Sequence, residues 1–81
     1  MRRFYLEMTN SIGFVHDEDG SEHPTLDLAR HEAILSIRSI LSDELEQSGT
    51  LDLRGFIEIK DESRRVLETI RFGSAITIKE D

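Results

Sequence analysis

The residues best suited to chemistry lie together in one acidic turn, His16–His23, with the sequence His-Asp-Glu-Asp-Gly-Ser-Glu-His. Its two imidazoles and four carboxylates are ligands that divalent metals accept in proteins. The calcium-loop pattern nevertheless fails, because placing Gly20 at the loop glycine puts Val15 at the first ligand and Leu26 at the final glutamate. We therefore predict a solvated turn with no metal and no cofactor. A metal-dependent enzyme built on His16–His23 is kept as a less favoured alternative.

Other sequence motifs of catalysis are incomplete. His31-Glu32 begins like the zinc-protease helix motif, but the second histidine should stand at position 35, which is Leu35. There is no phosphate loop, no dinucleotide glycine pattern and no Gly-x-Ser-x-Gly. The chain also has no cysteine, which excludes disulfides, thiolate metal sites and thiol catalysis. We therefore predict no catalytic residue and no enzyme activity.

Length and charge limit the function further. Chains of 81 residues can bury one modest core, so we expect a single domain over residues 1–81. The net charge is −7, and residues 1–48 hold four basic and ten acidic side chains, against six and seven in residues 49–81. An acidic surface repels phosphate backbones, so we expect no nucleic-acid partner. Because no apolar run approaches the roughly 20 residues of a membrane span and no signal-peptide stretch is present, we expect no membrane partner and a cytoplasmic protein.

The elements that must position these side chains follow from periodicity. Polar and apolar residues alternate from Arg3 to Thr9, which predicts a half-buried strand, and the apolar pattern restarts around Phe14, giving a first hairpin. The segments 56–60 and 65–72 flank a polar turn and predict a second hairpin. Ala75–Ile78 is predicted to form a short last strand. The fold class is α+β, a ββαββ unit whose antiparallel sheet of four or five strands carries one long amphipathic helix on one face.

The helix is predicted from about Thr25 to Gln47. Thr25 suits the N-cap, and Gly49 suits the C-terminal stop. At about 1.5 Å per residue the helix is about 34 Å long, longer than strands of six or seven residues, so it must cross the sheet diagonally or overhang it. Its predicted core stripe recurs at spacings of three and four and consists of Leu26, Ala29, Ala33, Ile34, Ile37, Ile40, Leu41 and Leu45.

Two leucines face away from that stripe. Leu28 and Leu35 lie two helical turns apart on the opposite side of the helical wheel, with His31 between them. Exposed leucines that line up on one solvent-facing side can seed contact with a partner. We therefore predict that Leu28, His31 and Leu35 form an interface, either with a protein partner that the sequence does not name or with the same helix of a second copy in a homodimer.

Short motifs in order along the chain resemble a family of short uncharacterised bacterial proteins, a domain of unknown function. These motifs are Phe4-Tyr5-Leu6, Asp17-Glu18-Asp19-Gly20 with Glu22, Leu26 through Ala29, Glu32-Ala33, Leu51-Asp52-Leu53 with Gly55, Ile57-Glu58-Ile59, Asp61-Glu62, and Phe72 with Ala75. The resemblance covers nearly the whole chain. It implies a ββαββ fold and a bacterial, cytoplasmic setting, and it implies no activity.

One position departs from the pattern of that family. The family tends to have glycine in the turn of the second hairpin, where this chain has Arg64. If the backbone there is left-handed, a residue with a Cβ costs about 1 kcal/mol relative to glycine.

A looser resemblance is to HicB-type antitoxins, which also place a strand hairpin and an acidic-glycine turn before an amphipathic helix. This chain lacks the proline-glycine stretch that usually separates their turn and helix. Two kinds of function thus follow from the sequence. The first is a small non-catalytic domain that acts by protein–protein contact or self-association, and the second is a HicB-like regulatory partner of a small toxin.

Overall fold

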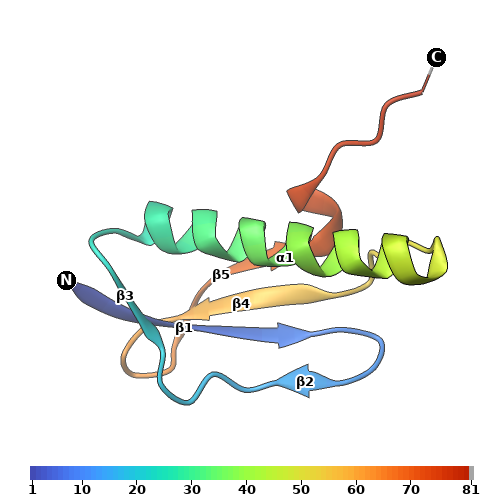
Figure 1. Cartoon of the computed structure of the whole chain (residues 1–81). Helices are drawn as coiled ribbons and strands as arrows, with labels where there is room; N and C mark the ends of the chain where they lie inside the picture. The colour runs from blue at the N-terminus through green and yellow to red at the C-terminus, as the bar shows by residue number, and fades with distance from the viewer. Residues whose placement is uncertain (81) are drawn as a thin grey trace.

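A computed structural model describes residues 1–80. An antiparallel sheet lies against one face of a single long helix, so the predicted α+β class is confirmed (Figure 1). The elements in chain order are β1 (Arg2–Thr9), β2 (Phe14–Val15), β3 (Ser21–His23), α1 (Leu26–Ser48), β4 (Phe56–Lys60), β5 (Val66–Arg71) and the short 3₁₀ helix η1 (Phe72–Ala75). No helix of residues 1–80 is long and apolar enough to cross a membrane.

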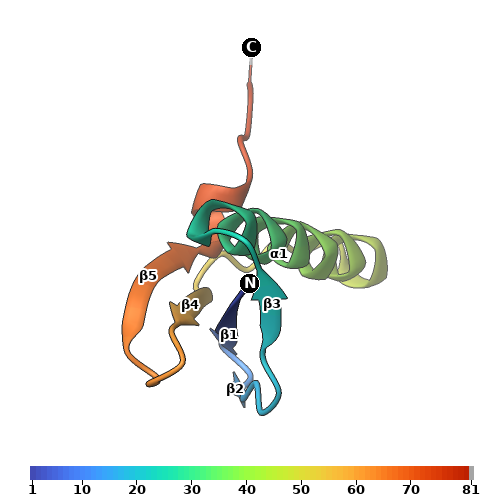
Figure 2. The same ribbon diagram turned by 90° about the vertical axis from the view of Figure 1, so that its left-hand side faces the viewer.

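The sheet has the order β2-β1-β4-β5, and β3 pairs with β1 as well. All pairings are antiparallel, with β1 lying opposite β4 from Tyr5↔Lys60 to Thr9↔Phe56. The outer edge of β1 is shared: β2 pairs with its last two residues and β3 with Arg2–Phe4. Consequently β5 forms the other edge of the sheet (Figure 2).

Both predicted hairpins are present, but the fifth strand is not the predicted one. Ala75–Ile78 was expected to be a strand, and that prediction is wrong. The chain turns into η1 instead, because the carbonyl of Ala75 accepts a hydrogen bond from Arg38 Nε at 2.7 Å and is fastened to the helix. The fifth strand is β3, whose sequence Ser-Glu-His has no apolar alternation. It is held by main-chain pairing with the edge of β1 and by two side-chain contacts, Arg3 Nη2 to Glu22 Oε1 at 2.8 Å and His23 Nε2 to Glu32 Oε2 at 2.9 Å.

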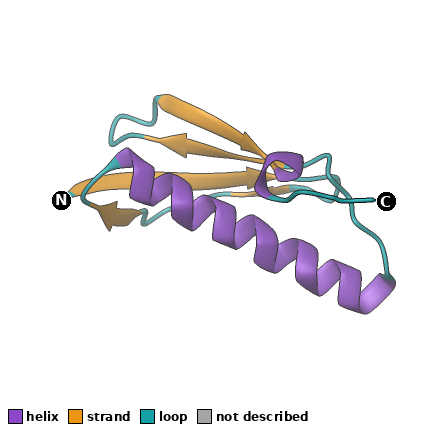
Figure 3. Cartoon of the chain, turned by 90° about the horizontal axis from the view of Figure 1, so that it is seen from above, coloured by secondary structure: helices purple, strands orange, loops and turns teal. Residues whose placement is uncertain are grey.

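The helix α1 has the predicted ends. The Thr25 hydroxyl accepts a hydrogen bond from the Leu28 amide at 3.2 Å, and Gly49 is left-handed with φ 70°. Both features satisfy main-chain groups that a helix leaves open at its termini. Seen from above, α1 crosses the sheet diagonally and its C-terminal turns extend beyond the strands (Figure 3). Both geometric alternatives expected from its length are therefore combined.

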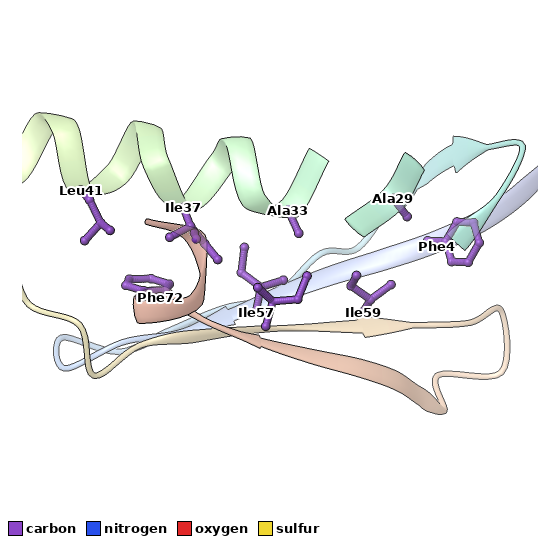
Figure 4. Packing of buried hydrophobic residues seen from close by; sticks show 10 residues of the cluster. Phe4, Ala29, Ala33, Ile37, Leu41, Ile57, Ile59 and Phe72 are labelled. Carbon is purple, nitrogen blue, oxygen red and sulfur yellow. The ribbon is translucent and has the colours of Figure 1, made fainter. Parts of the chain in front are cut away.

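The core lies between α1 and the sheet (Figure 4). Small side chains at Ala29 and Ala33 let the first half of the helix approach the strands closely, and the larger Ile37 and Leu41 fill the wider space further along. The buried core consists of Phe4, Ala29, Ala33, Ile37, Leu41, Ile57, Ile59, Ile70, Phe72 and Ala75. Seven of the eight predicted stripe residues are buried or half-buried, whereas Leu45 is 49% exposed. Leu45 lies in the part of the helix that overhangs the sheet.

The opposite face of the sheet carries no helix (Figure 1). Side chains alternate along a strand, so the residues of β1 between those that pack on the core point to this open face. Tyr5, Glu7 and Thr9 occupy it on β1 and lie directly opposite Lys60, Glu58 and Phe56 of β4.

Candidate functional site

A buried carboxylate stands at the centre of the open face. Glu7 is only 2% exposed, and within residues 1–80 it is the one charged residue that is buried. Its neighbours Leu6 and Met8 pack against the core, so the strand alternation directs Glu7 to the other side. Transferring a charge out of water is costly unless partners surround it, and Glu7 has four.

These partners come from three separate segments. Lys60 Nζ of β4 donates to Glu7 Oε1 at 2.7 Å, and Arg64 Nη1 of the second hairpin turn donates to Oε2 at 3.1 Å. The Asp17 amide donates to the same Oε2 at 3.2 Å, and His16 Nδ1 makes a close contact with it. We call Glu7, His16, Lys60 and Arg64 the Glu7 cluster.

The partners decide the protonation of Glu7. The hydrogen bond from Lys60 lowers the pKa of this carboxyl below its usual value of 4.5, and the Asp17 amide and the charges of Lys60 and His16 act in the same direction. Burial opposes them and raises the pKa, but its effect is smaller than that of the Lys60 bond. Glu7 is therefore an anion whose two oxygens are both occupied by donors. This arrangement ties β1 to the second hairpin and to the acidic turn.

The acidic turn His16–His23 does not bring its two histidines to a common point. His16 contacts Glu7, whereas His23 Nε2 lies 2.9 Å from Glu32 Oε2 of the helix. Among residues 1–80, no group of three or more potential metal ligands converges.

Within this turn, the Asp17 side chain binds main-chain amides of β1 and of the turn itself. Its carboxylate accepts from the Leu6 amide at 3.0 Å and from the Gly20 amide at 2.9 Å. Leu6 lies on the outer edge of β1 between the stretches that pair with β3 and β2, so Asp17 covers the part of that edge that neither strand reaches. The predicted solvated turn is thus only partly correct, because Glu18 and Asp19 are exposed while Asp17 is partly buried and bonded.

The predicted interface residues lie where the helical wheel places them. Leu28 and Leu35 are each 48% exposed, and His31 between them is exposed as well. The buried side of α1 is formed by Ala29, Ala33, Ile37 and Leu41. Leu28, His31 and Leu35, which we call the outer helix face, therefore point away from the sheet.

The charges of α1 are divided unequally between its sides. Its two basic residues are held on the side toward β5 and η1: Arg30 pairs with Glu68 of β5, with Nη2 2.9 Å from Oε1, and Arg38 binds the Ala75 carbonyl. The pairing with Glu68 and Asp27 raises the pKa of Arg30, so this charge is permanent. Among the exposed acidic residues of the helix, Asp27 is paired with Arg30 and Glu32 lies beside His23, whereas Asp43 and Glu46 add negative charge toward its C-terminal end.

The polar–apolar alternation from Arg3 to Thr9 is consistent with Glu7 on the non-core side of β1, but it does not identify the Glu7 cluster. The partners Lys60 and Arg64 are 53 and 57 residues away along the chain, and no local pattern links them. The one signal was the departure from glycine at Arg64, which has φ 68°. The structure therefore meets the condition under which the sequence analysis assigned a cost to this position, a left-handed backbone.

A comparison with known protein families shows which family the chain belongs to. A family model, a domain of unknown function named DUF6894, matches residues 3–73. The chain belongs to this family. The match extends from the start of β1 through the first residues of η1 and thus includes the Glu7 cluster and α1. It confirms the resemblance to a domain of unknown function, whereas no match supports the resemblance to HicB-type antitoxins. No curated protein and no solved structure matches the chain.

Proposed function

We propose that this DUF6894 domain acts by binding another protein through the outer helix face, without catalysis of its own. The observation that carries the proposal is the half-exposure of Leu28 and Leu35 on a rigid helix whose ends are capped. Apolar side chains on a regular element keep a fixed spacing, so a partner can bind them without first ordering the surface.

Charge supports a partner other than a second copy at this surface. Glu32, one helical turn from both Leu28 and Leu35, borders the outer helix face, and both arginines of α1 are engaged on the other side, Arg30 with Asp27 and Glu68 and Arg38 with the Ala75 carbonyl. Two copies of this face would bring like charges together, which costs free energy and opposes association. A partner with apolar side chains among basic residues fits better.

The absence of catalysis is part of the proposal. The deeply buried carboxylate, Glu7, accepts from Lys60, Arg64 and the Asp17 amide. A general base must come within hydrogen-bond reach of a substrate proton, and Glu7 is only 2% exposed beneath these donors. The Glu7 cluster is therefore better suited to holding the sheet and the turns together.

Affinity capture from a lysate of the source cells, followed by titration with the purified candidate, tests this function. Leu28→Ser/Leu35→Ser should abolish binding of a partner that wild type retains, because the apolar contacts are lost. Ser36→Ala/Gln47→Ala, on exposed positions of the same helix that lie away from the outer helix face, is the control and should bind as wild type. Binding should weaken as salt rises, because basic residues of the partner meet the acidic border. An affinity that is unchanged in the leucine variant would overturn the proposal.

A further inference from the structure

The two edges of the sheet differ in how far their main-chain groups are covered. On the outer edge of β1, β3 pairs with Arg2–Phe4, β2 pairs with Met8 and Thr9, and the Asp17 carboxylate accepts from the Leu6 amide between them. Free main-chain groups on an edge strand are a template for pairing with another strand, and proteins usually cover them. The edge formed by β5 has no such cover and lies at the outside of the molecule (Figure 2).

The direction of the free groups on β5 follows from one hydrogen bond. The Phe72 amide donates to the Gly55 carbonyl at 2.9 Å, so this pair is a hydrogen-bonded pair of the ladder. Hydrogen-bonded and non-hydrogen-bonded pairs alternate along antiparallel strands. In the observed register, Ile57↔Ile70 is then hydrogen-bonded, while Phe56↔Arg71 and Glu58↔Thr69 are not. The main-chain groups of Thr69 and Arg71 therefore point outward, away from β4.

We propose that a second copy of this chain pairs with this edge, β5 against β5, in an antiparallel register centred on Thr69. A two-fold axis through the Thr69 pair lets each Thr69 amide donate to the carbonyl of the other copy. The same register sets Arg71 opposite Leu67 of the second copy, and Glu68 opposite Ile70 of the second copy. Because a two-fold axis perpendicular to the sheet keeps each face on its own side, both helices lie on the same face of one continuous sheet.

Charge distinguishes this register from the one centred on Glu68. A shift that centres the axis on Glu68 would set two carboxylates directly opposite each other, which is destabilising. In the Thr69-centred register no two like charges of Leu67–Arg71 are directly opposite. Net charge within the second hairpin does not oppose the pairing, since residues 56–71 hold four basic and four acidic side chains.

Exposed apolar side chains at the same edge add to the pairing. Val66 and Leu67 are partly exposed at the start of β5, and a neighbouring strand would cover part of their surface. Five paired residues on each strand still form a small interface compared with permanent dimers. We therefore expect a dimer that dissociates on dilution. This inference adds self-association to the proposed function and uses a separate surface.

Solution mass over a concentration series, by light scattering or sedimentation equilibrium, tests the pairing. Wild type should shift from monomer to dimer. Thr69→Pro should weaken the dimer at least about thirtyfold, because proline lacks the amide that both copies use at the axis. In the monomer this amide points to solvent, and proline is tolerated at such edge positions. Thr69→Val, which keeps the amide and a β-branched side chain, is the matched control and should dimerise as wild type.

Amide hydrogen exchange on the wild-type chain provides a second readout that needs no variant. Exchange at Thr69 and Arg71 should slow as the concentration rises, while Ile70 should be protected at every concentration. A monomer at all concentrations overturns the inference, as does a dimer in which Thr69 and Arg71 exchange freely. Leu28→Ser/Leu35→Ser should dimerise normally, so failure of the helix-face proposal and failure of β5 pairing are distinguishable.

Discussion

Arg64 adopts a left-handed backbone and donates from Nη1 to Glu7 Oε2 at 3.1 Å. The same guanidinium lies 3.8 Å from the centre of the Tyr5 ring and donates to the Asp17 carbonyl at 3.0 Å. An arginine at φ 68° carries a backbone cost that glycine would avoid. Its side-chain contacts to the buried carboxylate and the aromatic ring offset that cost, which explains how the turn accommodates a residue other than glycine.

Two substitutions of Arg64 separate the cost of its left-handed backbone from the stabilisation by its side-chain contacts. Arg64→Ala and Arg64→Gly both lose the contacts to Glu7, Tyr5 and Asp17, but alanine also retains the left-handed strain. We expect Arg64→Ala to be less stable than Arg64→Gly by about 1 kcal/mol. Urea denaturation measures the difference. Equal stabilities of the two variants would mean that the turn relaxes to another conformation once the arginine is removed.

The Glu7 cluster should make stability depend on pH. The pKa of Glu7 is lower in the folded chain than its usual value of 4.5, so the unfolded chain binds more protons between these two pKa values. The contribution of Glu7 is therefore fully present above about pH 4.5 and is lost as the pH falls through the folded pKa. Thermal or urea unfolding from pH 7 down to pH 3 should show this loss.

Glu7→Gln provides the test of that assignment. The amide cannot pair with Lys60 and Arg64 as a charge, so we expect a loss of about 1–3 kcal/mol at pH 7. The slope of stability against pH below pH 4.5 should also become flatter than in wild type. Glu58→Gln, a neighbouring carboxylate at 4.0 Å from Lys60, is the control and should keep most of the slope. A slope that is unchanged in Glu7→Gln would contradict the role of Glu7.

Adding a single methyl group at Gly55 should lower the stability of the fold markedly. A Cβ there would lie 2.7 Å from the Phe72 ring and 2.9 Å from the Thr9 carbonyl oxygen. Since the ring belongs to the buried core and the oxygen to β1, neither can move cheaply. We expect Gly55→Ala to destabilise by about 2 kcal/mol in a thermal or chemical melt. Gly73→Ala, where the nearest atom would be 4.0 Å away, should change stability by less than about 0.5 kcal/mol.

The features that sequence reasoning predicted correctly are local. The Thr25 cap, the Gly49 stop and the two hairpins depend on residues that are neighbours along the chain. The length of α1 relative to the strands predicted a diagonal crossing or an overhang, and the structure has both. The exposure of Leu28 and Leu35 follows from the helical wheel alone. In each case, geometry over a few turns or a few strand residues is sufficient.

The features that it did not predict depend on contacts between distant segments. β3 forms because the edge of β1 offers main-chain partners to Ser21–His23, although the side chains have no strand pattern. Glu7 is buried because Lys60 and Arg64 cover it from the second hairpin. Where a strand was predicted at Ala75–Ile78, the chain instead ends η1 at Ala75, whose carbonyl accepts a hydrogen bond from Arg38 of the helix. None of these contacts leaves a periodic signal in the sequence.

Leu41 and Leu45 share one predicted core stripe but occupy different environments, and this difference can be measured. Leu41 is 3% exposed and packs against the sheet, whereas Leu45 is 49% exposed on the overhanging turns. We expect Leu41→Ala to cost about 2–4 kcal/mol, because it leaves a cavity, and Leu45→Ala to cost less than about 1 kcal/mol. Urea unfolding of the two variants checks this ranking. A large loss in Leu45→Ala would show that the end of α1 packs on a surface in solution, and light scattering of that variant would then show whether the surface belongs to a second copy.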